Sequence, residues 1–213
     1  MAGLEIRNGR EDDIEELIRV DKEAFSDDWF LSKDYFQVWL EVFPEGLFVA
    51  CLDGKQIGYA SVEIIEHDIK NPIPNWYEAT DNGFIRKTHN PSGNTIYGVS
   101  IAVSRYVASL RIGKRLMNTA IVKFVRDRNL KHGVVGSRIP GYYKVCSEMT
   151  AEEYVNKHRR NGWAIDPLVA FYQRCSFRIV KVLPNYIEDP FSLNWGVLMV
   201  FDNPNYKESK PDH

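Results

Sequence analysis

The chain has 213 residues, of which 44% are hydrophobic and 26% are charged, and its formal net charge is -2. This length suits one hydrophobic core and is short for two domains of usual size, so we expect residues 1–213 to form a single domain. The balanced charge gives no bulk attraction to nucleic acid, and no apolar run approaches the ~20 residues that span a bilayer. We therefore expect neither nucleic acid nor a membrane as partner.

The apolar periodicity predicts an alternation of strands and helices. The predicted elements are, in chain order, a strand at Leu4–Arg7, helices at Asp12–Phe25 and Ser32–Phe43, strands at Gly46–Leu52, Lys55–His67 and Thr95–Val103, a helix that ends at Asn129, a strand at Gly133–Ile139, a final helix, and strands at Phe177–Leu183 and Gly196–Phe201. Asp53-Gly54 is the strongest hairpin signal in the chain.

Two insertions, at 69–94 and 140–166, interrupt this order, and we expect them to set the substrate. The first is rich in turn-forming residues, but Trp76, Tyr77 and Phe84 give it apolar anchors. We therefore expect a packed loop, and loops of this length often cover a functional site.

The second insertion contains a capping box, formed by Thr150 and Glu153. It predicts an extra helix at Ala151–Asn161 that ends in the basic run Lys157–Arg160 and stops at Gly162. Basic side chains suit a helix C-terminus, so this run is either a solvated face or a site for an acidic partner.

The three cysteines, Cys51, Cys146 and Cys175, show neither a disulfide pattern nor zinc-ligand spacing. They fit a reducing compartment, and the first residues lack a hydrophobic signal core. We therefore expect a cytoplasmic protein without a metal site.

The segment 96–125 combines a β-rich run with a strongly amphipathic helix, whose first turn carries Arg111, Gly113 and Lys114. Free backbone amides at a helix N-terminus, beside cations and a glycine, suit a phosphate or pyrophosphate group. The alternative is a strand–loop–helix unit with a solvated basic start.

The stretch from Val103 to Leu116 resembles the acyl-CoA-binding motif of the GNAT superfamily, approximately V-x-P-x-Y-R-G-x-G-I-G-x-x-L. Ala108 stands where the family has Arg or Gln, and Arg111 stands where it has Gly, which lets the backbone approach the pyrophosphate. The predicted element order is also the order of this family. The resemblance implies an α/β (α+β) GNAT fold, a mixed, mostly antiparallel sheet splayed in a V with helices on both faces.

The resemblance further implies acetyl-CoA or another acyl-CoA as co-substrate, bound in the opening of the V. The backbone of Ile101 and Val103 is expected to pair with the pantetheine, and the amides from Ser109 to Lys114 are expected to surround the pyrophosphate. The residues implied to bind the co-substrate are Ile101, Ala102, Val103, Ala108, Ser109, Leu110, Arg111, Ile112, Gly113, Lys114 and Phe171.

A second match, from Leu168 to Val180, resembles the closing helix and strand of the family, with Phe171, Tyr172 and Phe177 on matching places. In the family, the tyrosine at this place often protonates the leaving thiolate, because the pKa of a phenol is near that of a thiol. The alternative is that Tyr172 is a packing residue with its hydroxyl at the surface.

The strand Thr95–Val103 carries no acid or histidine that could take a proton from an amine. On the neighbouring strand, Glu63 is the predicted general base, and His67 is a second candidate. The alternative is that each of them is a surface group. The resemblance also places residues 27–29, Asp-Asp-Trp, on the acceptor side, where acids favour a cationic amine.

The C-terminal half, with RIPGYY, AEEYV, DPLVAFY and LPNY, resembles the GNAT branch found beside nitrilase-like domains and in polyketide loading modules. Loading members use a histidine and an arginine that align with Tyr172 and Ile187, so malonyl decarboxylation is not supported. Three functions remain open. They are acetyl transfer from acetyl-CoA to a small-molecule or peptide amine, acyl loading from CoA onto a carrier-protein thiol, and a non-catalytic GNAT-fold module.

Overall fold

The computed structural model describes residues 3–25 and 30–208, except for the side chains of Ala108 and Ser109. Seven strands form one mixed sheet in the order β1-β2-β3-β4-β5-β7-β6, in which the β4–β5 pair is parallel and the other pairs are antiparallel. The strands are β1 (Leu4–Asn8), β2 (Leu47–Leu52), β3 (Lys55–Ile65), β4 (Thr95–Val103), β5 (His132–Arg138), β6 (Arg178–Leu183) and β7 (Gly196–Asp202). The predicted mixed, mostly antiparallel sheet is confirmed.

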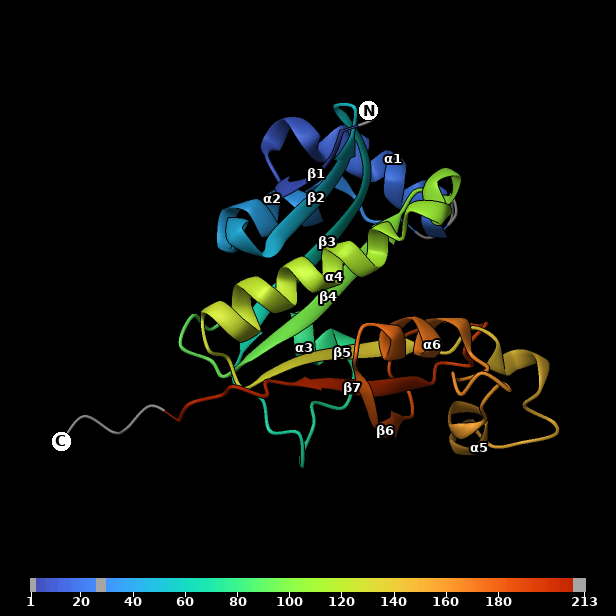
Figure 1. Cartoon of the computed structure of the whole chain (residues 1–213). Helices are drawn as coiled ribbons and strands as arrows, with labels where there is room; N and C mark the ends of the chain where they lie inside the picture. The colour runs from blue at the N-terminus through green and yellow to red at the C-terminus, as the bar shows by residue number, and fades with distance from the viewer. Residues whose placement is uncertain (1–2, 26–29, 209–213) are drawn as a thin grey trace.

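Helices cover both faces of this sheet (Figure 1). They are α1 (Ile14–Phe25), α2 (Lys33–Val42), α3 (Trp76–Thr80), α4 (Ile112–Ala120), α5 (Ala151–Asn156) and α6 (Pro167–Arg174), and α4 continues as a π-helical segment, Ile121–Asp127. The Tyr59 side chain of β3 bonds to Asp21 of α1, whereas Phe48 of β2 packs against Phe124. Phe48 pairs with Ala60, so Phe48 and Tyr59 point to opposite faces of the pleated sheet.

The largest buried cluster joins α1, α2 and α4 to the sheet and includes Trp39, Leu116 and Phe124, each fully buried. Burial of the helix positions that recur every three or four residues explains why these segments are helical. The β2–β3 turn has positive φ at both Asp53 and Gly54, as the predicted hairpin requires.

The first insertion is packed, as predicted. Asn75 caps α3 by accepting a hydrogen bond from the Glu78 amide at 2.9 Å, and Phe84 stacks on Tyr35 of α2 at 4.6 Å between ring centroids.

The second insertion corrects the predicted helix. The capping box of Thr150 and Glu153 is present, but α5 ends at Asn156, five residues before the predicted end. The basic run instead folds back on itself, because the Arg159 amide donates to the Trp163 carbonyl at 2.8 Å. Gly162 has a φ of 83° in this turn, so its left-handed backbone serves the turn rather than a helix end.

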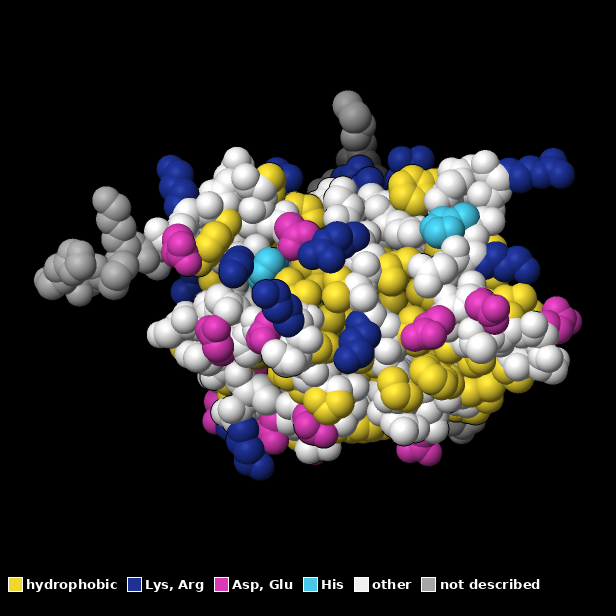
Figure 2. Space-filling model, turned by 90° about the horizontal axis from the view of Figure 1, so that it is seen from below, with side chains coloured by type: hydrophobic (Ala, Val, Ile, Leu, Met, Phe, Trp, Pro, Cys, Tyr) yellow, Lys and Arg dark blue, Asp and Glu magenta, His cyan; other side chains and the backbone are white. Residues whose placement is uncertain are grey.

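On the face shown in Figure 2, basic and acidic side chains are interspersed around an apolar area. Among residues 3–25 and 30–208, no helix has the length and apolar character needed to cross a membrane.

Candidate active site

The sheet opens between β4 and β5 because these parallel strands pair only at one end, over Thr95–Gly98 and His132–Val135. The β3–β4 register slips after Ser61, which makes Val99 an extra, bulged residue on β4. A bulge bends and twists its strand, and Figure 1 shows β4 and β5 diverging beyond this point. In the described part of the chain, the rest of β4 has no strand partner on its β5 side.

A cavity of about 450 Å³ fills this opening. Its walls come from β3, from β4 and β5 at the point of divergence, from α4 and α6, and from α1, α2 and α3. The residues that line it include Met117 of α4 and Tyr172 of α6 as well as Tyr35 of α2 and Trp76 of α3. The cavity therefore extends through the sheet, with one end toward α4 and α6 and the other toward α1 and α3.

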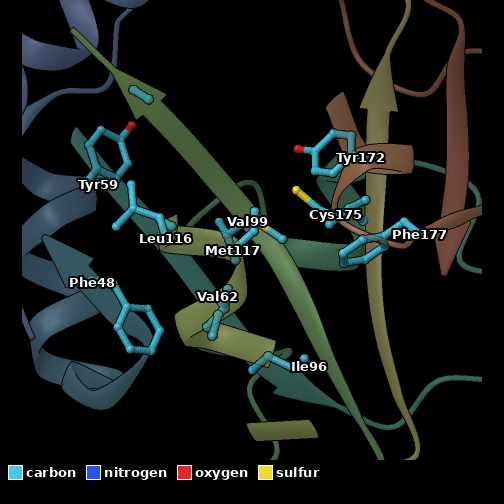
Figure 3. Packing of buried hydrophobic residues seen from close by; sticks show 14 of the residues in the cluster. Phe48, Tyr59, Val62, Ile96, Val99, Leu116, Met117, Tyr172, Cys175 and Phe177 are labelled. Atoms are coloured by element: carbon cyan, nitrogen blue, oxygen red, sulfur yellow. The ribbon is translucent and has the colours of Figure 1, made fainter. Parts of the chain in front are cut away.

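Tyr172 lines this cavity and is 8% exposed. Figure 3 shows its hydroxyl directed from α6 toward β4. Burial raises the pKa of Tyr172, the neighbouring Cys175 thiol raises it further, and Arg138 opposes the rise. The phenol is therefore protonated at neutral pH and has a proton to donate into the cavity.

The start of α4 lies beside α6. A Cβ atom at Gly113 would lie 3.2 Å from the Phe171 ring, so the glycine allows this ring to rest on the first turn of α4. The amides of Ile112, Gly113 and Lys114 come before the first helical hydrogen bond, which the Arg115 amide donates to the Arg111 carbonyl, so they have no acceptor within α4. The Lys114 side chain is exposed. This arrangement suits an anion.

Arg111, immediately before α4, has a left-handed backbone with a φ of 53°. This conformation costs a non-glycine residue about 1 kcal/mol, and it explains why the motif has glycine at this place. The exposed Arg111 side chain adds a cation where glycine would add none.

The predicted pantetheine residues divide into two groups. Ile101 lines the cavity, whereas Ala102 and Val103 continue β4 past its described walls. The segment Arg105–Leu110 forms a 3-10 turn with a kink at Val107 and carries the predicted positions Ala108, Ser109 and Leu110 between β4 and α4.

The predicted base, Glu63, is not among the residues that line the cavity. It is fully buried, and its Oε2 accepts a hydrogen bond from the Thr88 hydroxyl at 2.6 Å, within the first insertion. His67 is also buried, and neither residue is placed at the opening of the V. The role of Glu63 therefore stays a prediction, and positions 27–29 lie outside the described residues.

Three polar residues that sequence reasoning missed line or border the cavity. Asp21 is fully buried in α1 and accepts hydrogen bonds from the Tyr59 hydroxyl and, at 2.7 Å, from the Leu31 amide. The Tyr59 hydroxyl also lies 3.0 Å from Oγ of Ser100 on β4. One signal was available, because Asp21 lies four residues from both Leu17 and Phe25, on the apolar face of its helix.

The sequence profile described as the Acetyltransferase (GNAT) family matches residues 12–137, more than half of the chain. The chain belongs to the GNAT family. It is also 40% identical over 210 residues to the protein named "Uncharacterized N-acetyltransferase YkwB" of Bacillus subtilis (strain 168), a match that covers 97% of this chain and 92% of that protein.

Two solved structures share this GNAT fold at 20% identity. The loading GNATL domain of CurA from Lyngbya majuscula superposes with a TM-score of 0.78 over 94% of this chain and 98% of that domain. The GphF GNAT-like decarboxylase, solved in complex with isobutyryl-CoA, superposes with a TM-score of 0.79 over 93% of this chain and 98% of that chain. These likenesses confirm the predicted fold class.

The two sequence motifs that resemble the GNAT family lie on opposite sides of the opening in the sheet. The first motif lies between β4 and α4, and the second lies on α6 across the opening. Tyr172 and Ile187, which the sequence resemblance places at the histidine and arginine of loading members, both line the cavity. This GNAT protein therefore presents a phenol and an alkyl side chain at these two places.

Proposed function

We propose that this chain transfers an acyl group, with acetyl as the first case to test, from acyl-CoA to an amine, and that residues 1–213 act as one unit. The observation that carries this proposal is the position of Tyr172, whose hydroxyl faces β4 across a cavity that lies in the opening of the sheet. Family membership supports the acyl transfer, and the relative named as an N-acetyltransferase supports the amine.

The residues present fit acyl-CoA. The part of β4 beyond Gly98 is free of a β5 partner, so its backbone is available to the amide groups of the pantetheine. The amides of Ile112 to Lys114, with Arg111 and Lys114, suit the pyrophosphate. The isobutyryl-CoA of the GphF structure supports an acyl-CoA ligand for this fold.

When bound, acyl-CoA supplies an activated thioester. The chain orients this group along β4, excludes water with the apolar walls of the cavity, and donates a proton from Tyr172 to the departing sulfur. A phenol whose pKa is raised by burial keeps this proton at neutral pH.

Tyr172→Phe tests the role, because it removes the donor and keeps the ring that packs against Phe171 and Phe177. We expect turnover to fall by ~10²–10⁴-fold while acyl-CoA affinity, measured by calorimetry, changes little. Phe171→Leu is the matched control for lost packing and should weaken binding instead. Full turnover in Tyr172→Phe would leave Tyr172 a packing residue.

The second candidate is an acyl loader that acts on a carrier-protein thiol, and the similarity to the loading domain of CurA favours it. The basic run 157–160 is exposed and could meet an acidic carrier. Intact mass of a carrier protein after incubation with acyl-CoA separates the two functions. Acyl-CoA binding no tighter than millimolar would instead favour the non-catalytic module.

A further inference from the structure

The end of the cavity that faces α1 and α3 has an aromatic wall on each side. Phe25 and Tyr35 line it from α1 and α2, and Trp76 lines it from α3. The Trp76 indole donates to the Val99 carbonyl at the bulge of β4 at 2.9 Å, and Tyr35 stacks on Phe84. Both walls are therefore held in place before any ligand enters, which lowers the entropic cost of binding an apolar group between them.

Asp21 is the single acidic residue among the described residues that line this cavity, and it is fully buried. Its Oδ1 accepts a hydrogen bond from Tyr59 and its Oδ2 accepts one from the Leu31 amide, so each oxygen keeps a lone pair for a further donor. Since Tyr59 gives its single proton to Asp21, the 3.0 Å contact with Ser100 has the serine hydroxyl as donor. This buried chain of hydrogen bonds fixes the carboxyl group beside β4.

The cationic residue on the cavity wall, Arg138, already has a partner of opposite charge. Its Nη1 lies 3.4 Å from Oδ2 of the buried Asp189, and its guanidinium lies over the Phe25 ring, 5.2 Å from the centroid. Asp21 has no comparable cation among its described contacts. Burial raises the pKa of Asp21, and the hydrogen bonds from Tyr59 and Leu31 oppose this rise, which makes the carboxylate a better proton acceptor than an exposed aspartate.

We propose that Asp21 binds the ammonium group of a primary amine that carries an aromatic or branched apolar body and no second charge, and that it then takes a proton from that ammonium. This inference rests on the proposed function and names the class of its acceptor. The aromatic walls take the apolar body, and a second cation would have no counter-charge on these walls. A cation over the face of an aromatic ring is also attracted by the ring quadrupole.

The protons and bonds of this step balance. The ammonium gives one proton to the Asp21 carboxylate, and the neutral amine forms the C–N bond as the C–S bond of the thioester breaks. Tyr172 gives its proton to the sulfur and regains one from the nitrogen. Asp21 releases its proton to water, so the products are the amide, the free thiol and one proton.

Binding can be tested without acyl-CoA, by calorimetry with 2-phenylethylamine, its isosteric alcohol 2-phenylethanol, and 1,4-diaminobutane. For the wild type we expect 2-phenylethylamine to bind about 10- to 100-fold more tightly than the alcohol, the range of one charge-assisted hydrogen bond. Asp21→Asn should remove this advantage, and Asp34→Asn, an exposed aspartate on α2, should keep it.

The comparison of amine with alcohol uses the wild type, so it decides the matter even where Asp21→Asn does not fold. Equal affinities for amine and alcohol, unchanged amine affinity in a folded Asp21→Asn, or tighter binding of 1,4-diaminobutane would each overturn the inference. With acetyl-CoA present, turnover of 2-phenylethylamine should fall by ~10²–10⁴-fold in Asp21→Asn. Amine binding without turnover would refute acyl transfer alone, and turnover independent of Asp21 would refute this inference alone.

Discussion

Glu63→Gln should stabilise the protein at neutral pH. The carboxyl group is fully buried, Thr88 donates to its Oε2, and its Oε1 has no hydrogen-bond partner among the described residues. Burial raises the pKa of Glu63 from 4.5 to about 8. An acid whose pKa is raised by folding stabilises the fold fully below its unfolded pKa, and this contribution is lost as the pH rises from 4.5 toward 8.

The size of the effect follows from this titration. Each pH unit between the two pKa values corresponds to about 1.4 kcal/mol, so Glu63 has cost about 3 kcal/mol of the free energy of unfolding by pH 7. Glutamine does not titrate, and its side-chain oxygen still accepts from Thr88. For a chain of this size, the gain corresponds to a rise in melting temperature of roughly 6–12 °C at pH 7.

Urea unfolding of wild type and Glu63→Gln at several pH values from 4 to 8 measures this difference. The two midpoints should coincide near pH 4 and separate as the pH rises, whereas Glu5→Gln, an exposed control on β1, should follow the wild type. Equal midpoints at every pH would refute the reasoning. Loss of turnover in a stable Glu63→Gln would instead support the sequence prediction that Glu63 is the general base.

Three further changes test the packing. Asp13→Asn should lower the free energy of unfolding by about 1–3 kcal/mol. Burial alone would raise the pKa of Asp13, but hydrogen bonds, led by that from Arg7, lower it, so this stability is present above pH 3.8 and is lost in stronger acid. The urea midpoints of variant and wild type should therefore converge in stronger acid. Gly136→Ala places a Cβ atom 1.8 Å from the Tyr186 hydroxyl and should cost about 1–3 kcal/mol by urea unfolding, unlike Gly3→Ala, which meets no atom within 4 Å. Thr150→Ala should cost about 1 kcal/mol through the lost helix cap, and the serine variant should retain it in thermal unfolding.

Most of the fold could be predicted because local patterns and tertiary packing agree. The strand Thr95–Val103 has the predicted bounds, and the second helix begins and ends within one residue of its prediction. The helix at Ala151 was predicted too long. Basic residues are favourable both in the last turn of a helix and just after its end, so the basic run after Asn156 does not show where the helix stops. Pairing of His158 with Ala164, which no local pattern indicates, decided the outcome.

The site was harder to predict than the fold. The motifs indicated Tyr172 and the start of the helix at Ile112, since these depend on local sequence. The polar chain of Asp21, Tyr59 and Ser100 joins three elements, and its members lie up to 79 residues apart, as the numbering shows. Only the register of β3 on β4 brings Tyr59 and Ser100 together, and that register includes a bulge that sequence periodicity does not reveal.

The short β4–β5 ladder has a consequence for how the chain assembles. Strands β1 to β4 and strands β5 to β7 are each contiguous in sequence and antiparallel, whereas four residue pairs at Thr95–Gly98 join them. Each half of the sheet can therefore form from nearby chain segments, whereas the parallel pairing of β4 with β5 joins segments that are distant in sequence. A ligand that spans the V contacts both halves of the sheet at its open end, so its binding should slow amide hydrogen exchange in both halves at once.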